Sequence, residues 1–132
     1  MTSILAHIEI KPGKEPKFEA IMQDMVERTF SEESGVIRYE YFKGQVQNFY
    51  YCLLVFKDKW AFYQHQNSDH HEGHDFGEVI KDIRLEYLDP VDGANPLPHT
   101  ENPPLTDDME ESLKQAQKAY PILIADWWAH RK

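Results

Sequence analysis

Four of the seven histidines lie within ten residues of one another, and their spacing is the first hint of chemistry in the sequence. His65, His70, His71 and His74 are interleaved there with Asp69, Glu72 and Asp75. Imidazole titrates near neutral pH, so a histidine beside an aromatic cavity can move a proton to or from a phenolic or enolic substrate. We take His65 as the first candidate for such a general base. Each histidine taken alone is also consistent with a surface or capping residue.

The same histidines could instead bind a metal ion. On a helix His70 and His74 would share one face, as would His71 and Asp75. The nearest zinc motif, H-E-x-x-H, has Asp75 where its second histidine belongs, and Gly73 weakens the helix on which the geometry depends. We therefore assign no metal ligand, and a metal-binding module within the His65–His74 cluster remains a third hypothesis for function.

Other catalytic signatures are missing from the sequence. It has no G-x-G-x-x-G or G-x-x-x-x-G-K-[ST] phosphate cradle and no G-x-S-x-G nucleophile elbow. The single cysteine, Cys52, lies among apolar residues, where a thiol usually acts as a small inert hydrophobe, although it would be reactive if it faced a cavity. We accordingly expect no bound cofactor.

The composition limits the partners and the location of the chain. Its 132 residues, 41% of them hydrophobic, suit one domain with a real core. A net charge of -9 argues against nucleic acid or an anionic membrane as the main partner. There is no apolar run of about 18 residues and no basic segment of an export signal. With a single cysteine, which cannot form an internal disulfide, we expect a cytoplasmic protein.

Hydrophobic periodicity places six elements in the first 88 residues. Strands show alternation of apolar residues, whereas helices repeat them at spacings of three, four and seven. The predicted elements are strand 3–10, helix 15–31, strands 36–43 and 49–57, a helical region that starts near Asp58 and is interrupted around 68–75, and strand 83–88. The order β-α-β-β-α-β predicts an α+β, ferredoxin-like fold, an antiparallel four-stranded sheet with both helices on one face.

Two helices would leave the second face of this sheet uncovered. The predicted first strand offers His7 and Glu9 on its second face, and the third strand is apolar on both faces, with Tyr50 and Cys52 on one of them. Strands that are apolar on both faces are normally buried on both. We expect a second copy of the chain to cover the sheet and enclose a cavity for a small molecule. Alternatively, the 40 or so C-terminal residues cover this face and nothing binds there.

Prolines divide the chain near residue 89. Five of the eight lie between Pro90 and Pro104, where they favour an extended linker. The predicted organisation is a domain at 1–89, a Pro-rich linker at 90–106 and a helical C-terminal arm at 107–132. After Pro121 the arm is apolar nearly all round and must be buried against something. It could pack on its own subunit, clamp the partner subunit or cap the mouth of the cavity.

Three motifs follow one another in the first 90 residues. They are Ile-Leu-Ala-His-Ile-Glu-Ile-Lys-Pro-Gly from Ile4, Glu-Ser-Gly-Val-Ile-Arg-Tyr-Glu from Glu33, and Phe-Lys-Asp-Lys-Trp-Ala-Phe-Tyr-Gln-His from Phe56, followed by Ser68-Asp-His70. In order and spacing they resemble the antibiotic biosynthesis monooxygenase-like family of dimeric α+β barrels, which includes quinol monooxygenases. Phe56 takes the position of a family tryptophan, and His65 and His70 take those of two family histidines.

The resemblance implies a homodimer with one cavity per subunit. Many members are thought to oxidise phenols or quinols with O2 and no cofactor, because the deprotonated substrate supplies the electrons itself. Carried over to this sequence, His65 at the cavity rim and His70 would be catalytic. The substrate-binding residues would be His7, Glu9, Tyr50, Cys52, Phe56 and Trp60.

Two departures from the family pattern affect the expected chemistry. Phe56 lacks the indole N–H with which a tryptophan could hold a substrate oxygen. The Asn, Trp and His of the haem-degrading branch are not matched, which argues against haem degradation.

The leading hypothesis is therefore a cofactor-independent monooxygenase that oxidises a small aromatic, phenolic or quinol-type compound with O2. The alternative is a non-catalytic dimeric protein that binds a small molecule, or an isomerase of the same fold.

Overall fold

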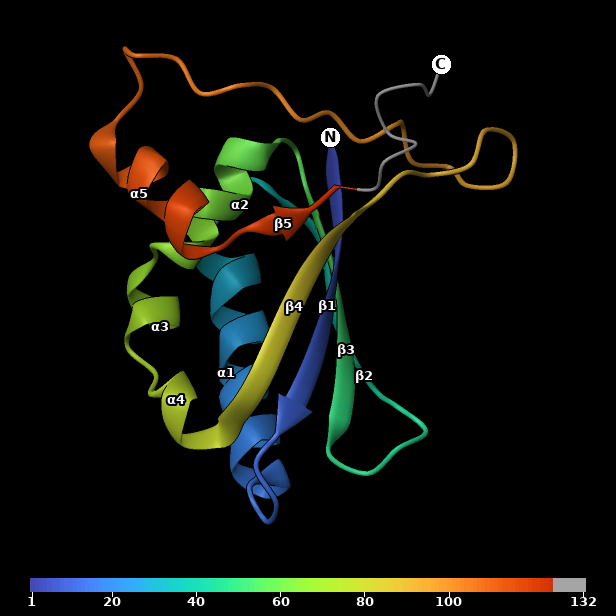
Figure 1. The fold of residues 1–132 in the computed structure, drawn as a ribbon, viewed down its shortest axis with the longest axis vertical. Helices are drawn as coiled ribbons and strands as arrows, with labels where there is room; N and C mark the ends of the chain where they lie inside the picture. The colour runs from blue at the N-terminus through green and yellow to red at the C-terminus, as the bar shows by residue number, and fades with distance from the viewer. Residues whose placement is uncertain (125–132) are drawn as a thin grey trace.

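The computed structural model describes residues 1–124 and has the predicted order of strands and helices (Figure 1). The elements are β1 (Thr2–Ile10), α1 (Glu15–Glu32), β2 (Val36–Lys43), β3 (Phe49–Phe56), α2 (Lys59–Gln66), α3 (Asp69–Glu72), α4 (Phe76–Val79), β4 (Ile80–Leu88), α5 (Glu111–Ala119) and β5 (Ile122–Leu123). The α+β, ferredoxin-like fold with a C-terminal helix is thus confirmed. The interruption predicted around 68–75 holds the short helix α3, and β4 begins three residues earlier than expected.

The sheet has the strand order β2-β3-β1-β4-β5. All neighbours are antiparallel except β4 and β5, which pair in parallel through Leu85 and Ile122. The short strand β5 was not predicted, because two residues after a proline carry no periodicity of their own. In the central pairing Ala6 lies opposite Cys52, and His7 lies opposite Tyr51.

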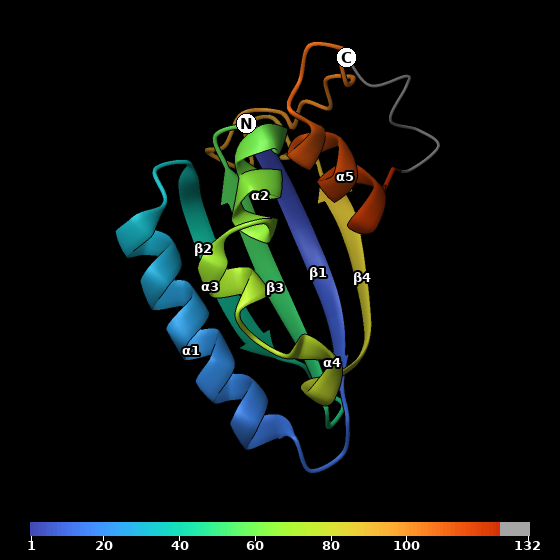
Figure 2. The same ribbon diagram turned by 90° about the vertical axis from the view of Figure 1, so that its left-hand side faces the viewer.

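Local signals explain where the two main helices begin. Pro16 lies in the first turn of α1, where its missing N–H costs nothing. Asp58 caps α2, because its carboxylate accepts a hydrogen bond from the backbone N–H of Ala61 at 2.8 Å. Both helices lie over the same face of the sheet (Figure 2). Buried apolar residues of both helices and of the sheet form one core.

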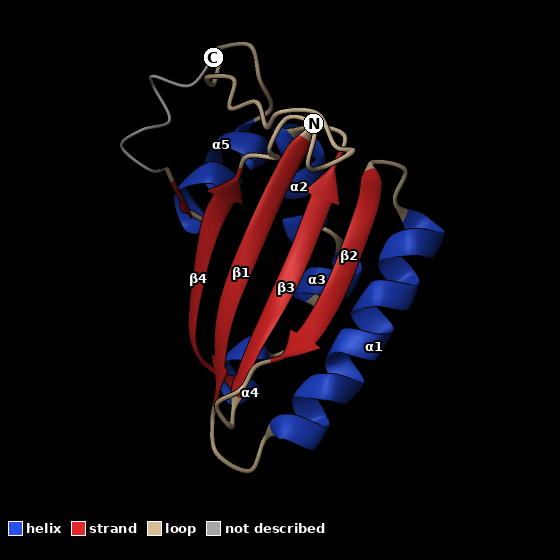
Figure 3. Cartoon of the chain, turned by 90° about the vertical axis from the view of Figure 1, so that its right-hand side faces the viewer, coloured by secondary structure: helices blue, strands red, loops and turns tan. Residues whose placement is uncertain are grey.

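The opposite face of the sheet carries no helix (Figure 3). Phe42, Phe49 and Tyr51 are exposed there, at 51%, 40% and 39%. Up to residue 124 the C-terminal residues do not lie over this face, since α5 packs beside α2 and β5 extends the sheet. The alternative that the C-terminal residues cover the face therefore fails for the part of the chain that is described.

The proline-rich segment after β4 is extended and is fastened to the end of the sheet. No helix or strand occurs between residues 89 and 110. The Thr100 hydroxyl accepts a hydrogen bond from the backbone N–H of Ser3 at 3.1 Å. The buried amine of Lys59 donates to Asn102 Oδ1 at 2.8 Å and to the carbonyl of Pro103 at 2.9 Å. These contacts hold the segment against the N-terminal end of β1 and the first residue of α2.

The C-terminal arm differs from its predicted form in two respects. The predicted helix opens at Asp107, but α5 begins at Glu111 after a turn in which the Thr106 hydroxyl donates to Asp108. The predicted burial after Pro121 can be followed only to residue 124, where Leu123 and Ile124 are about half exposed. The rest of that segment lies outside the described residues. Within residues 1–124 no helix is both long and apolar enough to cross a membrane.

Candidate functional site

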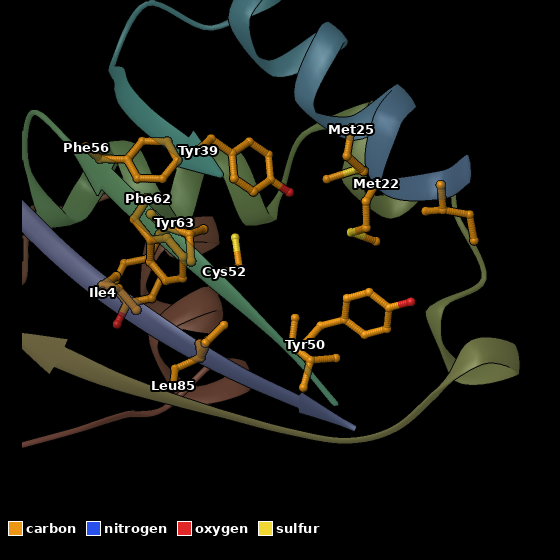
Figure 4. Packing of buried hydrophobic residues seen from close by; sticks show 14 of the residues in the cluster. Ile4, Met22, Met25, Tyr39, Tyr50, Cys52, Phe56, Phe62, Tyr63 and Leu85 are labelled. Atoms are coloured by element: carbon orange, nitrogen blue, oxygen red, sulfur yellow. The ribbon is translucent and has the colours of Figure 1, made fainter. Parts of the chain in front are cut away.

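A cavity of about 760 Å³ lies between the sheet and the helices. Its floor is apolar and includes Ala6, Cys52 and Leu54 of the sheet, and Met22 and Met25 of α1 form part of its roof. Figure 4 shows the Cys52 sulfur and these two methionines pointing into the space between α1 and the sheet. A concave, mostly apolar space of this size is typical of sites for small organic molecules.

The cavity lies on the other side of the sheet from where we expected it. Because side chains alternate along a strand, Ala6 and Cys52 face the helices while their neighbours His7 and Tyr51 face away. His7 is paired instead with Glu86, at 2.6 Å, and Glu9 with Lys81, at 3.3 Å. The six predicted substrate-binding residues therefore do not line one cavity within a subunit, because His7 and Glu9 lie on the face of the sheet away from the helices.

Of these six residues, Cys52 is the one that lines the cavity. Tyr50 donates a hydrogen bond to Glu19 Oε2 at 2.6 Å and lines a second hollow between α1 and β2. Phe56 is fully buried behind the cavity, with its ring centroid 5.3 Å from that of His65. Trp60 is half-buried and packs against Tyr63.

His65 lines the cavity and is fully buried, whereas we expected it at the rim. Helix α2 directs the ring inward between Tyr39 and Phe56. Its Nδ1 lies 2.9 Å from Glu33 Oε2. Its Nε2 is buried and has no hydrogen-bond partner among residues 1–124. An ionised carboxylate can only accept, so Nδ1 carries a proton, and in the neutral form of the ring the lone pair is then on Nε2.

Glu33 holds two histidines at once. Its Oε2 also lies 2.6 Å from His70 Nε2, and the Thr29 hydroxyl lies within 3.4 Å of the facing nitrogen of each ring. Burial raises the pKa of Glu33, but hydrogen bonds and charge from His65 and His70 outweigh it, so the net pKa is below its usual value. Glu33 is therefore an anion that fixes the orientation of the His65 ring.

The structure separates the other histidines of the cluster. His70 lies behind Glu33 rather than on the cavity wall, and its Nδ1 is 3.1 Å from Glu32 Oε2. His74 reaches out to Asp24 on α1, at 2.8 Å. His71 lines the cavity, and burial and the charge of neighbouring His65 lower its pKa to about 4. Since α3 ends before Gly73, the helical face that would have joined His70 and His74 does not form.

One group of side chains in the described part of the chain has the geometry to hold a metal ion. Single ligand atoms of Glu33, His65 and His70 all lie within 4.8 Å of one another. The group differs from the set first considered, because it includes a carboxylate 32 residues before His65 and excludes His71 and His74. The sequence pattern could not reveal this group, because only folding brings the end of α1 against α2.

Hydroxyl and thiol groups line the same cavity as His65. The hydroxyls of Tyr39 and Tyr41 are 2.7 Å apart, and both residues line the cavity with Cys52. Burial raises the pKa of all three groups well above the usual range, so they are protonated at neutral pH and can donate hydrogen bonds. The two tyrosines were not singled out from the sequence, although their i,i+2 spacing on a strand puts them on one face.

Solved structures of other proteins share this fold. One from Pseudomonas aeruginosa is 18% identical with a TM-score of 0.61, covering 68% of this chain and 93% of its own. One from Mycobacterium tuberculosis is 18% identical with a TM-score of 0.62, covering 71% and 98%. A third, which bears the name antibiotic biosynthesis monooxygenase, is 20% identical with a TM-score of 0.61, covering 69% and 99%. No match was found among curated proteins.

The sequence pattern of a protein family extends over the first part of the chain, from β1 to α3. It is the family described as antibiotic biosynthesis monooxygenase, and it matches residues 1–74, which include β1 to α3 and both histidines held by Glu33. This match spans more than half of the 132 residues. The chain belongs to the antibiotic biosynthesis monooxygenase family.

Proposed function

We propose that this protein is a cofactor-independent monooxygenase that oxidises a small phenolic or quinol-type compound with O2. The observation that carries the proposal is the unpartnered Nε2 of His65 at the cavity wall, with Nδ1 held by Glu33. A buried nitrogen without a partner costs free energy, which a substrate hydroxyl would recover by donating to it. The apolar walls suit an aromatic ring.

The proposed reaction begins with proton transfer from the substrate hydroxyl to His65 Nε2. The Glu33 carboxylate stabilises the resulting imidazolium, and the hydroxyl of Tyr39 or Tyr41 can donate to the phenolate oxygen. The electron-rich phenolate then reduces O2, and a ring carbon forms a bond to one oxygen atom to give a hydroperoxide. His65 returns its proton to the peroxide, and the ring carbon loses its hydrogen as a proton when the O–O bond breaks, so that the departing hydroxide leaves as water. Overall, a phenol with a hydrogen on the attacked ring carbon reacts with O2 to give a quinone and water, and the substrate supplies all four electrons.

The test is oxygen uptake with a panel of quinols and polyphenols. We expect His65→Ala to lower the enzymatic rate by roughly 10² to 10⁴-fold, the usual contribution of general acid–base catalysis. Glu33→Gln keeps the shape but not the charge of the carboxylate, and we expect a smaller loss. His74→Ala is the matched control, because His74 is held by Asp24 away from the cavity. A wild-type rate no higher than the spontaneous rate on every compound would refute the proposal.

The second candidate function is binding of a small hydrophobic molecule without turnover, favoured by the predominantly apolar cavity walls. A His65→Ala variant that keeps its affinity, with no turnover in either form, supports this candidate. An isomerase would use the same base but consume no O2. A metal-binding role would use Glu33, His65 and His70, and metal analysis of protein purified without an affinity tag tests it directly.

We also propose that two copies of the chain associate through the open face of the sheet. Support comes from the aromatic side chains exposed there, Phe42, Phe49 and Tyr51, which would cost free energy in contact with water. Sedimentation of wild type and Tyr51→Lys tests this, because a charge at the centre of the interface should release monomers.

We propose the cytoplasm as the location of the protein. Cys52 is a buried free thiol, which suits this reducing compartment.

A further inference from the structure

The C-terminal arm supplies one wall of the cavity. Helix α5 packs beside α2 (Figure 2), and its side chains Leu113 and Ala116 are buried in the core. The chain then turns back along β4, and β5 pairs with that strand (Figure 1). The arm residues that line the cavity are Ala119, Tyr120, Pro121 and Leu123. The arm therefore both packs on its own subunit and bounds the space in which a ligand would lie.

Tyr120 connects this wall to the histidine region. Its hydroxyl donates to Glu72 Oε1 at 3.1 Å. Its ring meets the edge of His71, with centroids 5.8 Å apart and planes at 88°. His71 in turn lies 5.6 Å from the His65 ring. Tyr120 thus stands at the end of the cavity where the proposed base is found, and it is held there at both its ring and its hydroxyl.

The arm is additional to the shared fold. The three solved structures match over nearly their whole length, yet cover only about two thirds of this chain. The family pattern ends at residue 74, before β4 and the arm. A wall that comes from outside the shared fold can change which size of ligand the cavity accepts, while the residues that hold the base stay the same.

We propose that the C-terminal arm sets the size of the aromatic compound that the cavity accepts, and that Tyr120 is the side chain that limits it. The inference rests on the proposed binding of an aromatic compound in this cavity, but not on its oxidation. Shortening Tyr120 opens the cavity at this end, whereas enlarging Leu123 narrows it. The two changes should therefore move the preferred ligand size in opposite directions.

The experiment measures dissociation constants for three fluorescent phenols of increasing size, 2-naphthol, 9-phenanthrol and 1-hydroxypyrene, with the full-length protein. We expect Tyr120→Ala to shift the ratio of affinities toward 1-hydroxypyrene by about tenfold, the usual scale for steric discrimination in an apolar pocket. Leu123→Trp should shift the ratio toward 2-naphthol. Lys118→Ala is the matched control on the exposed side of α5 and should leave the ratio unchanged.

The opposite signs separate a change in the cavity from a loss of structure. Tyr120→Phe keeps the ring and loses the bond to Glu72, so it should keep the wild-type ratio. If Tyr120→Ala does not fold, the direction of the Leu123→Trp shift decides the question. If the affinity ratios of Tyr120→Ala and Leu123→Trp both stay within twofold of wild type, the proposed role of the arm is overturned, but the proposed binding site is not. Failure of all three phenols to bind to the wild type would overturn the proposed binding site as well.

Discussion

The contact between Gly35 and Ala61 gives the sharpest test of how the site is held together. Gly35 lies two residues after Glu33, and Ala61 lies one helical turn before His65 on α2. A Cβ atom added to Gly35 would lie 2.6 Å from the Cβ of Ala61, about 0.8 Å closer than ordinary van der Waals contact. The backbone of Gly35 does not have a positive φ, so an alanine would be opposed by this contact and not by its own backbone.

We expect Gly35→Ala to lower the free energy of unfolding by about 1 to 2 kcal/mol. Overpacking a tight contact costs about 1 to 3 kcal/mol. Against this, loss of glycine flexibility in the unfolded chain returns about 0.4 to 1 kcal/mol. Ala61→Gly alone should cost about 1 kcal/mol, because glycine disfavours a helix. In the double variant the clash is gone, so the combined loss should be smaller than the sum of the two single losses by the cost of the clash, about 1 to 3 kcal/mol.

The assay is urea unfolding of the four proteins at 25 °C, with m-values compared to confirm that the same transition is measured. The reasoning is refuted if the two changes add within about 0.5 kcal/mol, as they do at independent sites. If the coupling is present, Gly35→Ala should also weaken the hydrogen bond between Glu33 and His65, because the added methyl group displaces α2. Oxygen uptake in Gly35→Ala should then fall, and Ala61→Gly should restore it in the double variant.

Two further predictions concern the titration of groups in the cavity wall. The pKa of His71 is lowered to about 4, so between pH 6.5 and 4 the unfolded chain binds a proton that the folded chain does not. The free energy of unfolding therefore decreases as pH falls through this window, and His71 does not affect it above the window. Unfolding measured at several pH values should show a smaller loss over this window in His71→Phe than in wild type, and equal losses would contradict the shift. Burial raises the pKa of the Cys52 thiol, so we expect native protein to react with 5,5′-dithiobis(2-nitrobenzoate) at pH 8 at least about tenfold more slowly than urea-unfolded protein. A native rate equal to the unfolded rate would show that the thiol is open to solvent.

The fold could be predicted from the sequence because apolar residues recur along each main helix and strand with the spacing typical of that element. Alternation in β1 and the helical spacing from Phe18 to Met25 are local properties, and local properties survive in the folded chain. The same local pattern placed His65 on α2. The short strand β5 carried no such signal, because it exists only through its pairing with β4.

The site depended on contacts that no local pattern records. Period two put His7 and Glu9 on the face of the sheet without helices, where the structure has them, but it does not show that a cavity within the subunit lies on the opposite face, with Ala6. Glu33 meets His65 only because the end of α1 packs against α2. Sequence alone thus determined the elements and pointed to His65, the histidine that we propose as the base. Tertiary structure determined its carboxylate partner, the side of the sheet on which the cavity lies, and the arm that closes it, since these are contacts between residues far apart in the chain.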